Sequence, residues 1–268
     1  MDTKKTADLI LVSEKDNIAL LRFNRPQARN ALSEAMLQAL LDALDAVAQR
    51  QDIRAVVIAA SGLAFSSGHD LKELTAHRAD PDKGRAFFAH LVDLCATVMK
   101  KITTLPQPVI AAVDGVASAA GCQLVASCDL ATAGYASRFS TPGVNIGLFC
   151  STPMVPLSRN LSRKHAMEML TLGEMFSASD AHRFGLINRV VADGQAEFEA
   201  LRMARIIAEK SPVALKVGKK AFYDQLEMTQ SEAYRHVSEI MVENMLAQDA
   251  EEGFEAFLNK RTPQWPGK

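Results

Sequence analysis

The sequence lacks an excess of charge of either sign and has no long apolar run. Its 268 residues include 30 basic and 31 acidic side chains, which leave a net charge of -1. Nucleic acids and anionic membrane surfaces attract clustered basic residues, and here the two signs are interspersed. No apolar stretch approaches the ~20 residues needed to cross a bilayer. We therefore expect no nucleic-acid partner and no membrane association.

Targeting patterns are also missing from residues 1–7. Lys4 and Lys5 are not followed by the apolar segment of a signal peptide, and the Arg-rich amphipathic pattern of a transit peptide is absent. On this basis the sequence predicts a cytoplasmic protein.

Cysteine is scarce, and its spacing forms no pair. The chain has 4 cysteines, without a CxxC motif and without a histidine at metal-ligand spacing. We expect buried free thiols, no disulfide framework and no metal site.

What the sequence does contain is an alternation of strand-length apolar runs with helical patterns. Runs at residues 18–23, 55–59 and 109–113 are typical of strands, and residues 84–103 have the spacing of a long amphipathic helix. From residue 158 onward the pattern is nearly all helical. This order predicts an α/β core followed by a helical C-terminal region that packs on a neighbouring subunit.

One segment fits neither pattern. Residues 139–153 contain two prolines and two glycines among apolar residues, which predicts a long irregular loop. Loops of this length are often functional.

Two of the strand-like runs lead into junctions rich in small residues. Ala55–Ala59 precedes the segment Phe65–Lys72, and Val109–Val113 precedes Ala119–Gln123. The first N–H groups of a helix have no intrahelical partner, so two such junctions can aim two N–H groups at one oxygen and form an oxyanion hole. Taken singly, either loop could carry glycine and alanine for packing alone.

The order of the motifs resembles the crotonase (enoyl-CoA hydratase/isomerase) superfamily. The likeness runs nearly from end to end of the chain, which makes it specific. It is carried by residues 65–74, 108–115, 119–129 and 141–147, and by the outer motifs at 24–32 and 257–261.

This resemblance implies a spiral of ββα units with a C-terminal helical trimerisation region, assembled as a trimer or a dimer of trimers. Residues 1–200 would form the core with an acyl-CoA site, and residues 201–268 the oligomerisation region. The activity implied is that of an enoyl-CoA hydratase-like lyase of fatty-acid metabolism. Coenzyme A would be part of the substrate, and no separate cofactor is implied.

The resemblance also implies the roles of individual residues. The N–H groups of His69 and Ala120 would hold the thioester carbonyl oxygen, with Gln123 beside the reacting carbons. Among the expected substrate-binding residues, Arg25 and Lys72 would lie near the phosphates, and the carbonyls of Ser66 and His69 would face the adenine and pantetheine. Phe257 and Lys260 would reach a neighbour's ligand. The residues expected around the acyl group are Gly68, Gly121, Gly143 and Cys150.

The chain departs from the family at its two catalytic glutamates, whose places are taken by Gln123 and Gly143. An amide cannot exchange a proton near pH 7 and glycine has no side chain, so a weak hydratase is expected. Few groups could substitute for the glutamates. His69 has a titratable ring, Asp70 more plausibly caps the next helix, and Cys150 has no obvious activating base.

Two other functions stay open. Decarboxylases of malonyl-type CoA thioesters in this superfamily also carry Gly-His-Asp at the first junction and need no carboxylate pair, although Cys150 replaces a tyrosine of one such type. The other possibility is an acyl-CoA-binding protein without catalytic activity.

Overall fold

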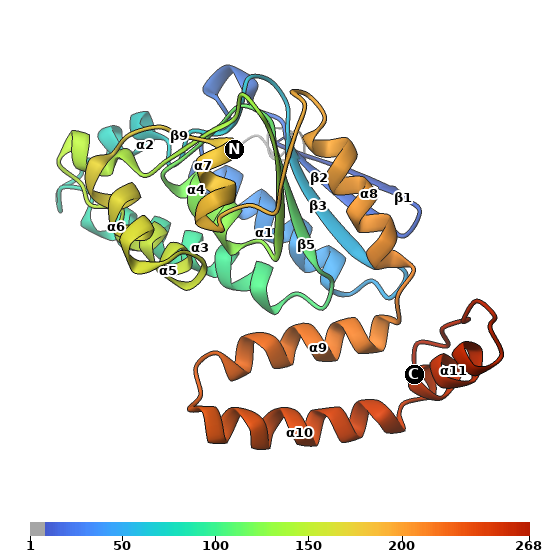
Figure 1. Ribbon diagram of the computed structural model, residues 1–268. Helices are drawn as coiled ribbons and strands as arrows, with labels where there is room; N and C mark the ends of the chain where they lie inside the picture. The colour runs from blue at the N-terminus through green and yellow to red at the C-terminus, as the bar shows by residue number, and fades with distance from the viewer. Residues whose placement is uncertain (1–8) are drawn as a thin grey trace.

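A six-stranded sheet forms the centre of the molecule (Figure 1). The computed structural model describes residues 9–268, so the residues used to predict a location lie outside it. β1 and β2 form an antiparallel hairpin, and the other strands run parallel to β2. The strands, in spatial order, are β1 (Ile10–Lys15), β2 (Ile18–Phe23), β3 (Ala55–Ala60), β5 (Val109–Val113), β7 (Leu130–Gly134) and β10 (Arg189–Val191).

A second sheet of four short strands lies beside the first. Its strands, in spatial order, are β4 (Ala64–Ser66), β6 (Val116–Ser118), β8 (Arg138–Ser140) and β9 (Phe176–Ser177). The chain passes three times from a strand of the large sheet to a strand of the small sheet and then to a helix. This repeat confirms the predicted ββα spiral.

Helices cover both faces of the large sheet. On one face, α1 (Glu34–Ala48) and α3 (Arg85–Thr104) share an apolar cluster with every second residue of β3 and β5. On the other face, α8 (Ala196–Ala208) shares a second apolar cluster with the intervening residues of the same two strands. Strands buried on both faces are expected to be continuously apolar, as β3 and β5 are.

The remaining helices of the core surround the small sheet. They are η1 (Pro26–Ala28), α2 (Leu71–His77), α4 (Ala120–Ser127), η2 (Pro142–Ile146), α5 (Ser151–Asn160), α6 (Arg163–Leu172) and α7 (Ala178–Phe184). The predicted irregular loop at 139–153 is therefore wrong in part, because it contains η2 and the start of α5. Pro153 and Pro156 concealed α5, since proline inside a helix removes a hydrogen bond.

The last third of the chain is not helical throughout. β9 adds to the small sheet and β10 pairs with β7 in the large one, although each has three residues or fewer. Such short strands carry no readable periodicity, and tertiary pairing alone stabilises them.

The C-terminal helices extend away from the core as an arm. The arm consists of α9 (Pro212–Gln225), α10 (Gln230–Leu246) and α11 (Gln248–Leu258), with α9 and α10 side by side below the sheet (Figure 1). The predicted division at residue 200 stays a prediction. α8 lies across that boundary and packs on the sheet.

One buried ion pair anchors the arm to the core. The Lys219 ammonium on α9 lies 2.6 Å from Asp129 and donates to the carbonyl oxygens of Ile102 and Gln107 at 2.9 and 3.0 Å. Tyr223 adds a hydrogen bond to Asp129 at 2.8 Å. Burial lowers the pKa of Lys219, and the charge of Asp129 opposes that shift.

Candidate active site

The two predicted junctions lie beside each other because β4 and β6 are paired in parallel, with Ala64 opposite Val116. The contact between them leaves no room for side chains. A Cβ on Gly68 would lie 2.8 Å from the Cβ of Ala119, and one on Gly121 would lie 2.5 Å from the carbonyl oxygen of Ser66. Gly68 also has a φ of 88°. Glycine is thus required at both positions by close approach.

Two backbone N–H groups at these junctions stay available. The first junction pairs with Leu32. The N–H of Leu32 donates to the Gly68 carbonyl at 2.8 Å, and the Leu32 carbonyl accepts from the N–H of Asp70 at 3.4 Å. His69 lies between those two bonds, so its own N–H faces the other way. None of the hydrogen bonds within residues 9–268 uses the N–H of His69, or that of Ala120 at the start of α4.

The backbone of the second junction is strained. Ala119 has φ 49° and ψ -117°, although it is not glycine. Such a conformation costs of order 1–3 kcal/mol and persists only where its surroundings impose it. Here the Ala119 N–H donates to the carbonyl of Ser140 at 2.9 Å, which holds the turn against β8.

A buried asparagine supports the first junction. The Asn30 side chain donates to the carbonyls of Ser61 and Ala64 at 2.9 and 2.8 Å and accepts from the N–H of Arg25 at 2.9 Å. Ser66 donates to the Asn30 carbonyl at 2.9 Å and accepts from the Gly68 N–H at 3.3 Å. No role for Asn30 is predicted from the sequence. Its position between an Arg-Pro turn and α1 is the sequence feature that could have indicated this supporting role.

Asp70 caps α2, as predicted. Its carboxylate accepts from the N–H groups of Lys72 and Glu73 at 3.0 and 3.4 Å and from Arg25 at 2.8 Å. Burial raises the pKa of Asp70, but these hydrogen bonds outweigh burial and leave the pKa lowered. Arg25 is therefore bound to Asp70, and Lys72 is exposed on α2.

Gln123 is buried within α4, a helix without charged residues. Its side-chain oxygen lies 3.9 Å from the Cys95 thiol of α3. Burial raises the pKa of Cys95 to about 12, so this thiol is protonated at neutral pH. The amide of Gln123 thus contacts an uncharged thiol.

Gly143 occupies a position that is closed to a side chain. A Cβ there would lie 2.7 Å from the Leu148 carbonyl oxygen and 3.0 Å from the Cys150 sulfur. Burial raises the pKa of Cys150, which a contact with the Gly143 backbone partly offsets. The structure brings Gly143 and Cys150 together and leaves no space for a carboxylate between them.

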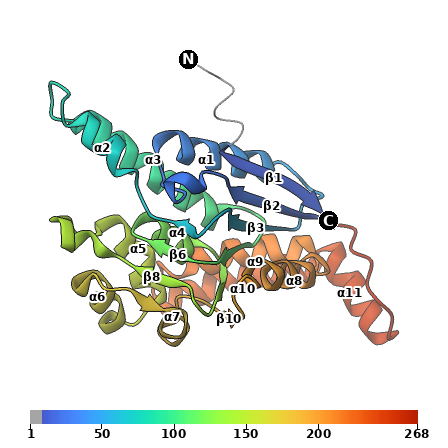
Figure 2. The same ribbon diagram turned by 90° about the horizontal axis from the view of Figure 1, so that it is seen from above.

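Phe257 and Lys260 do not join the junctions within one chain. Phe257 lies on α11 and is 83% exposed, and Lys260 follows the end of that helix. Figures 1 and 2 place α11 and α2 at opposite ends of the molecule.

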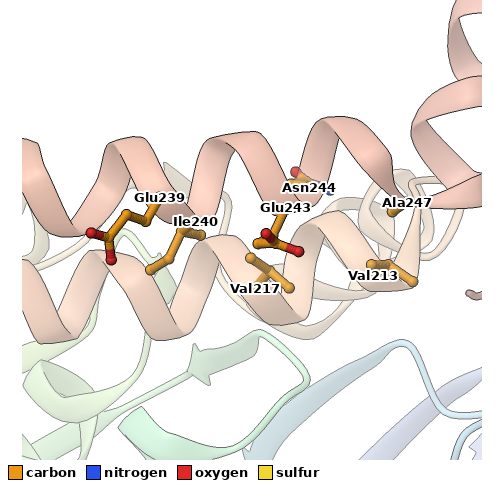
Figure 3. Close-up of a pocket in the computed structure, with 7 residues that line it drawn as sticks. All are labelled: Val213, Val217, Glu239, Ile240, Glu243, Asn244 and Ala247. Atoms are coloured by element: carbon orange, nitrogen blue, oxygen red, sulfur yellow. The ribbon is translucent and has the colours of Figure 1, made fainter.

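A groove of about 240 Å³ lies in the arm rather than at the junctions (Figure 3). It is formed by α9 and α10 and is lined by Val213, Val217, Glu239, Ile240, Glu243, Asn244 and Ala247. Within the described residues, no group of three or more His, Cys, Asp or Glu side chains could hold a metal ion. None of the described helices is long and apolar enough to cross a membrane.

Comparison with known proteins identifies the family. A family model for enoyl-CoA hydratase/isomerase matches residues 13–268. The chain belongs to the enoyl-CoA hydratase/isomerase family. Its relatives include rat enoyl-CoA hydratase domain-containing protein 3, mitochondrial, which is 47% identical over 252 residues that cover 94% of this chain and 82% of the relative.

Solved structures confirm the crotonase fold of this family member. The human enoyl-CoA hydratase domain-containing protein 3 aligns with a TM-score of 0.91 at 45% identity, covering 96% of this chain and 100% of that one. An enoyl-CoA hydratase of Mycobacterium smegmatis aligns with a TM-score of 0.91 at 50% identity, covering 96% of this chain and 98% of that one. The sequence predicts a protein of the enoyl-CoA hydratase domain-containing protein 3 type from residues 66–70, 119–123 and 147–153. These relatives confirm that prediction.

The predicted cytoplasmic location is wrong by the same comparison. The rat, mouse, Xenopus and human relatives are named mitochondrial, which points to the mitochondrion rather than the cytoplasm. The prediction relied on the composition of residues 1–7, and the lack of a recognisable targeting pattern there does not fix the compartment of the protein.

Proposed function

We propose that this family member binds an acyl-CoA thioester and holds its carbonyl oxygen with the N–H groups of His69 and Ala120. The observation that carries the proposal is the pair of unused N–H donors at two junctions pressed together by Gly68 and Gly121. Negative charge that develops on the oxygen during enolate formation would be stabilised there. Removing one such donor typically costs ~10²–10³ in rate.

Hydration is expected to be slow because both glutamate positions lack a carboxylate. Each general acid or base typically contributes ~10²–10⁴. Gln123 can orient a water molecule through its amide but cannot take the proton of that water.

The test compares Gln123→Glu and Gly143→Glu with the parent protein on crotonyl-CoA. Gln123→Glu should raise the hydration rate by at least ~10-fold, because it supplies a general base at a site that already holds a side chain of this size. Gly143→Glu should not raise it, since the Leu148 carbonyl and Cys150 block its side chain. Parent rates typical of efficient hydratases would contradict the proposal.

Decarboxylation of a malonyl-type thioester is a second candidate function. The closed position at Gly143 favours it, because loss of carbon dioxide generates the enolate without a carboxylate base. Release of carbon dioxide from methylmalonyl-CoA would distinguish this reaction from hydration. Affinity for acyl-CoA without turnover of either substrate would instead indicate a binding protein.

Recognition of the coenzyme A portion is assigned to the outer face of the first junction. Lys72 is exposed and available to a phosphate, whereas Arg25 must share its guanidinium with Asp70. We expect Lys72→Ala to weaken acyl-CoA binding without changing the unfolding midpoint. No separate cofactor is required by this scheme.

A homotrimer or a dimer of trimers would complete the site. α10 has no buried residue, and the outer surface of the arm carries exposed apolar side chains. They are Met241, Val242, Met245, Leu246, Phe254, Phe257 and Leu258. A surface this apolar is typical of an oligomer interface, and the groove in Figure 3 adds an apolar concavity to it.

Sedimentation velocity tests the assembly. Leu246→Glu, which changes an arm residue 75% exposed in the single chain, should dissociate the oligomer. Leu63→Glu changes a residue 95% exposed outside the arm and should leave the assembly intact. Monomeric parent protein at micromolar concentration would contradict the proposed assembly.

A further inference from the structure

The side chain of His69 has a hydrogen-bond partner of its own. Its Nδ1 lies 3.3 Å from the carbonyl oxygen of Leu32. A carbonyl oxygen can only accept a hydrogen bond, so Nδ1 of the neutral ring carries the hydrogen. The other nitrogen, Nε2, then has a free lone pair. The Leu32 carbonyl thereby selects the tautomer in which Nε2, rather than Nδ1, can accept a proton.

The charges around this ring are already paired or directed to solvent. Asp70 is bound to Arg25, Glu73 accepts from the N–H of Glu34 at 3.1 Å, and Lys72 is exposed. Neither α4 nor η2 contains a charged residue. Burial lowers the pKa of His69, and the bond to Leu32 opposes that shift. The ring is neutral at pH 7 and therefore able to act as a base.

We propose that Nε2 of His69 is the base that removes the α-proton of the bound thioester. This assignment rests on the proposed function, because the same residue supplies one of the two oxygen-binding N–H groups. In a family member without either glutamate, the imidazole is a titratable side chain of the oxygen-binding loop that, unlike Asp70, forms no ion pair within the described residues.

The step is balanced without any further reactant. The α-carbon–hydrogen bond breaks, its electron pair forms the carbon–carbon double bond of the enolate, and the carbonyl π electrons move to the oxygen held by His69 and Ala120. The proton goes to Nε2, while Nδ1–H continues to donate to Leu32. Return of the proton from the imidazolium to carbon restores the neutral ring.

Deuterium exchange into butyryl-CoA in D2O tests the proposal with the full-length protein. The decisive variant is His69→Asn, because the asparagine NH2 group can replace Nδ1–H as donor to Leu32 while Nε2 is lost. Its backbone N–H is retained. Exchange followed by mass spectrometry should fall by about 10²-fold, while the Kd for butyryl-CoA stays within about 3-fold, as expected when the backbone donors are unchanged.

The matched control is His90→Asn, which changes an exposed histidine paired with Glu34. Its exchange rate should equal that of the parent protein. The exchange rate of the parent protein should also decline as the pH falls through the pKa of the ring. The same decline should be missing from the pH profile of His69→Asn. Added imidazole should restore part of the exchange in His69→Ala.

Three results would overturn the assignment. Exchange by His69→Asn at the parent rate would exclude the ring as the base. Binding of butyryl-CoA by the parent protein without any exchange would exclude α-proton removal while leaving the binding function intact. Failure of the parent protein to bind butyryl-CoA would reject the proposed function and this step with it.

Discussion

The paired junctions are tightly packed, whereas the C-terminal arm is loosely packed within the single chain. At the junctions, backbone atoms approach so closely that a single Cβ on Gly121 would meet a carbonyl oxygen at 2.5 Å. In the arm, Gly218 of α9 has no atom within 4 Å of the Cβ position, and α10 buries no residue. The junctions pack tightly within one chain, whereas the arm leaves apolar side chains exposed.

The difference shows where each region obtains its stability. The junctions depend on short backbone hydrogen bonds and on the side chains of Asn30 and Ser66, all within one folded core. The arm is joined to that core by a buried ion pair and leaves apolar side chains of α10 and α11 exposed. The two regions should therefore respond differently to matched substitutions.

The largest effect is expected at the anchor of the arm. Lys219→Met leaves the Asp129 carboxylate without its cation, and breaking a buried pair in this way costs about 3–5 kcal/mol in the free energy of unfolding. Urea denaturation followed by circular dichroism measures it. Lys220→Met is the matched control, because Lys220 is 75% exposed and its pair with Asp224 is on the surface. Equal losses in the two variants would contradict a special role for the buried pair.

The next effect is expected at the contact between the junctions. Gly121→Ala should lower the free energy of unfolding by about 1–3 kcal/mol through overpacking against Ser66. It should also weaken butyryl-CoA binding, because separating the junctions separates the two N–H groups. Isothermal titration calorimetry and urea denaturation together check this. A stable variant with unchanged affinity would show that the close approach is not needed.

A smaller effect with a defined pH dependence is expected at the cap of α2. Asp70→Ala removes an N-cap and should cost about 1 kcal/mol at pH 7. The pKa of Asp70 is lowered from its ordinary 3.8 in the folded protein, so its contribution is fully present above 3.8 and is lost as the pH falls through the lower folded value. Urea titrations at pH 7 and near pH 2 should show the difference between parent and variant shrinking at the lower pH.

The smallest effect, of opposite sign, is expected in the arm. Gly218→Ala makes the same change as Gly121→Ala in the middle of a helix, where alanine is favoured by about 0.5–1 kcal/mol. We expect a small rise in the thermal unfolding midpoint and unchanged activity. A fall in the midpoint would show that a neighbouring subunit packs against this glycine.

Much of the fold followed from local patterns in the sequence. The hairpin, β3, β5 and the long helix α3 have enough residues for their apolar spacing to be read, and Ser33 caps α1 by accepting from Met36 at 3.2 Å. The strands of the small sheet were missed because three residues define no period. η2 and α5 were hidden by prolines in the segment predicted to be irregular.

By itself, the sequence determined the two small-residue junctions, the presence of Gln123 and Gly143, and the family, because these depend on which residues are present and in what order. Tertiary structure alone decided that Gly143 is closed by Leu148 and Cys150, that Arg25 is held by Asp70, and that the His69 ring donates to Leu32. The contacts of Arg25 with Asp70 and of Leu32 with His69 join segments 45 and 37 residues apart in the chain, so they form only when the chain folds. The closure of Gly143 is local, but it depends on the path of the backbone from η2 to α5, which no apolar periodicity records.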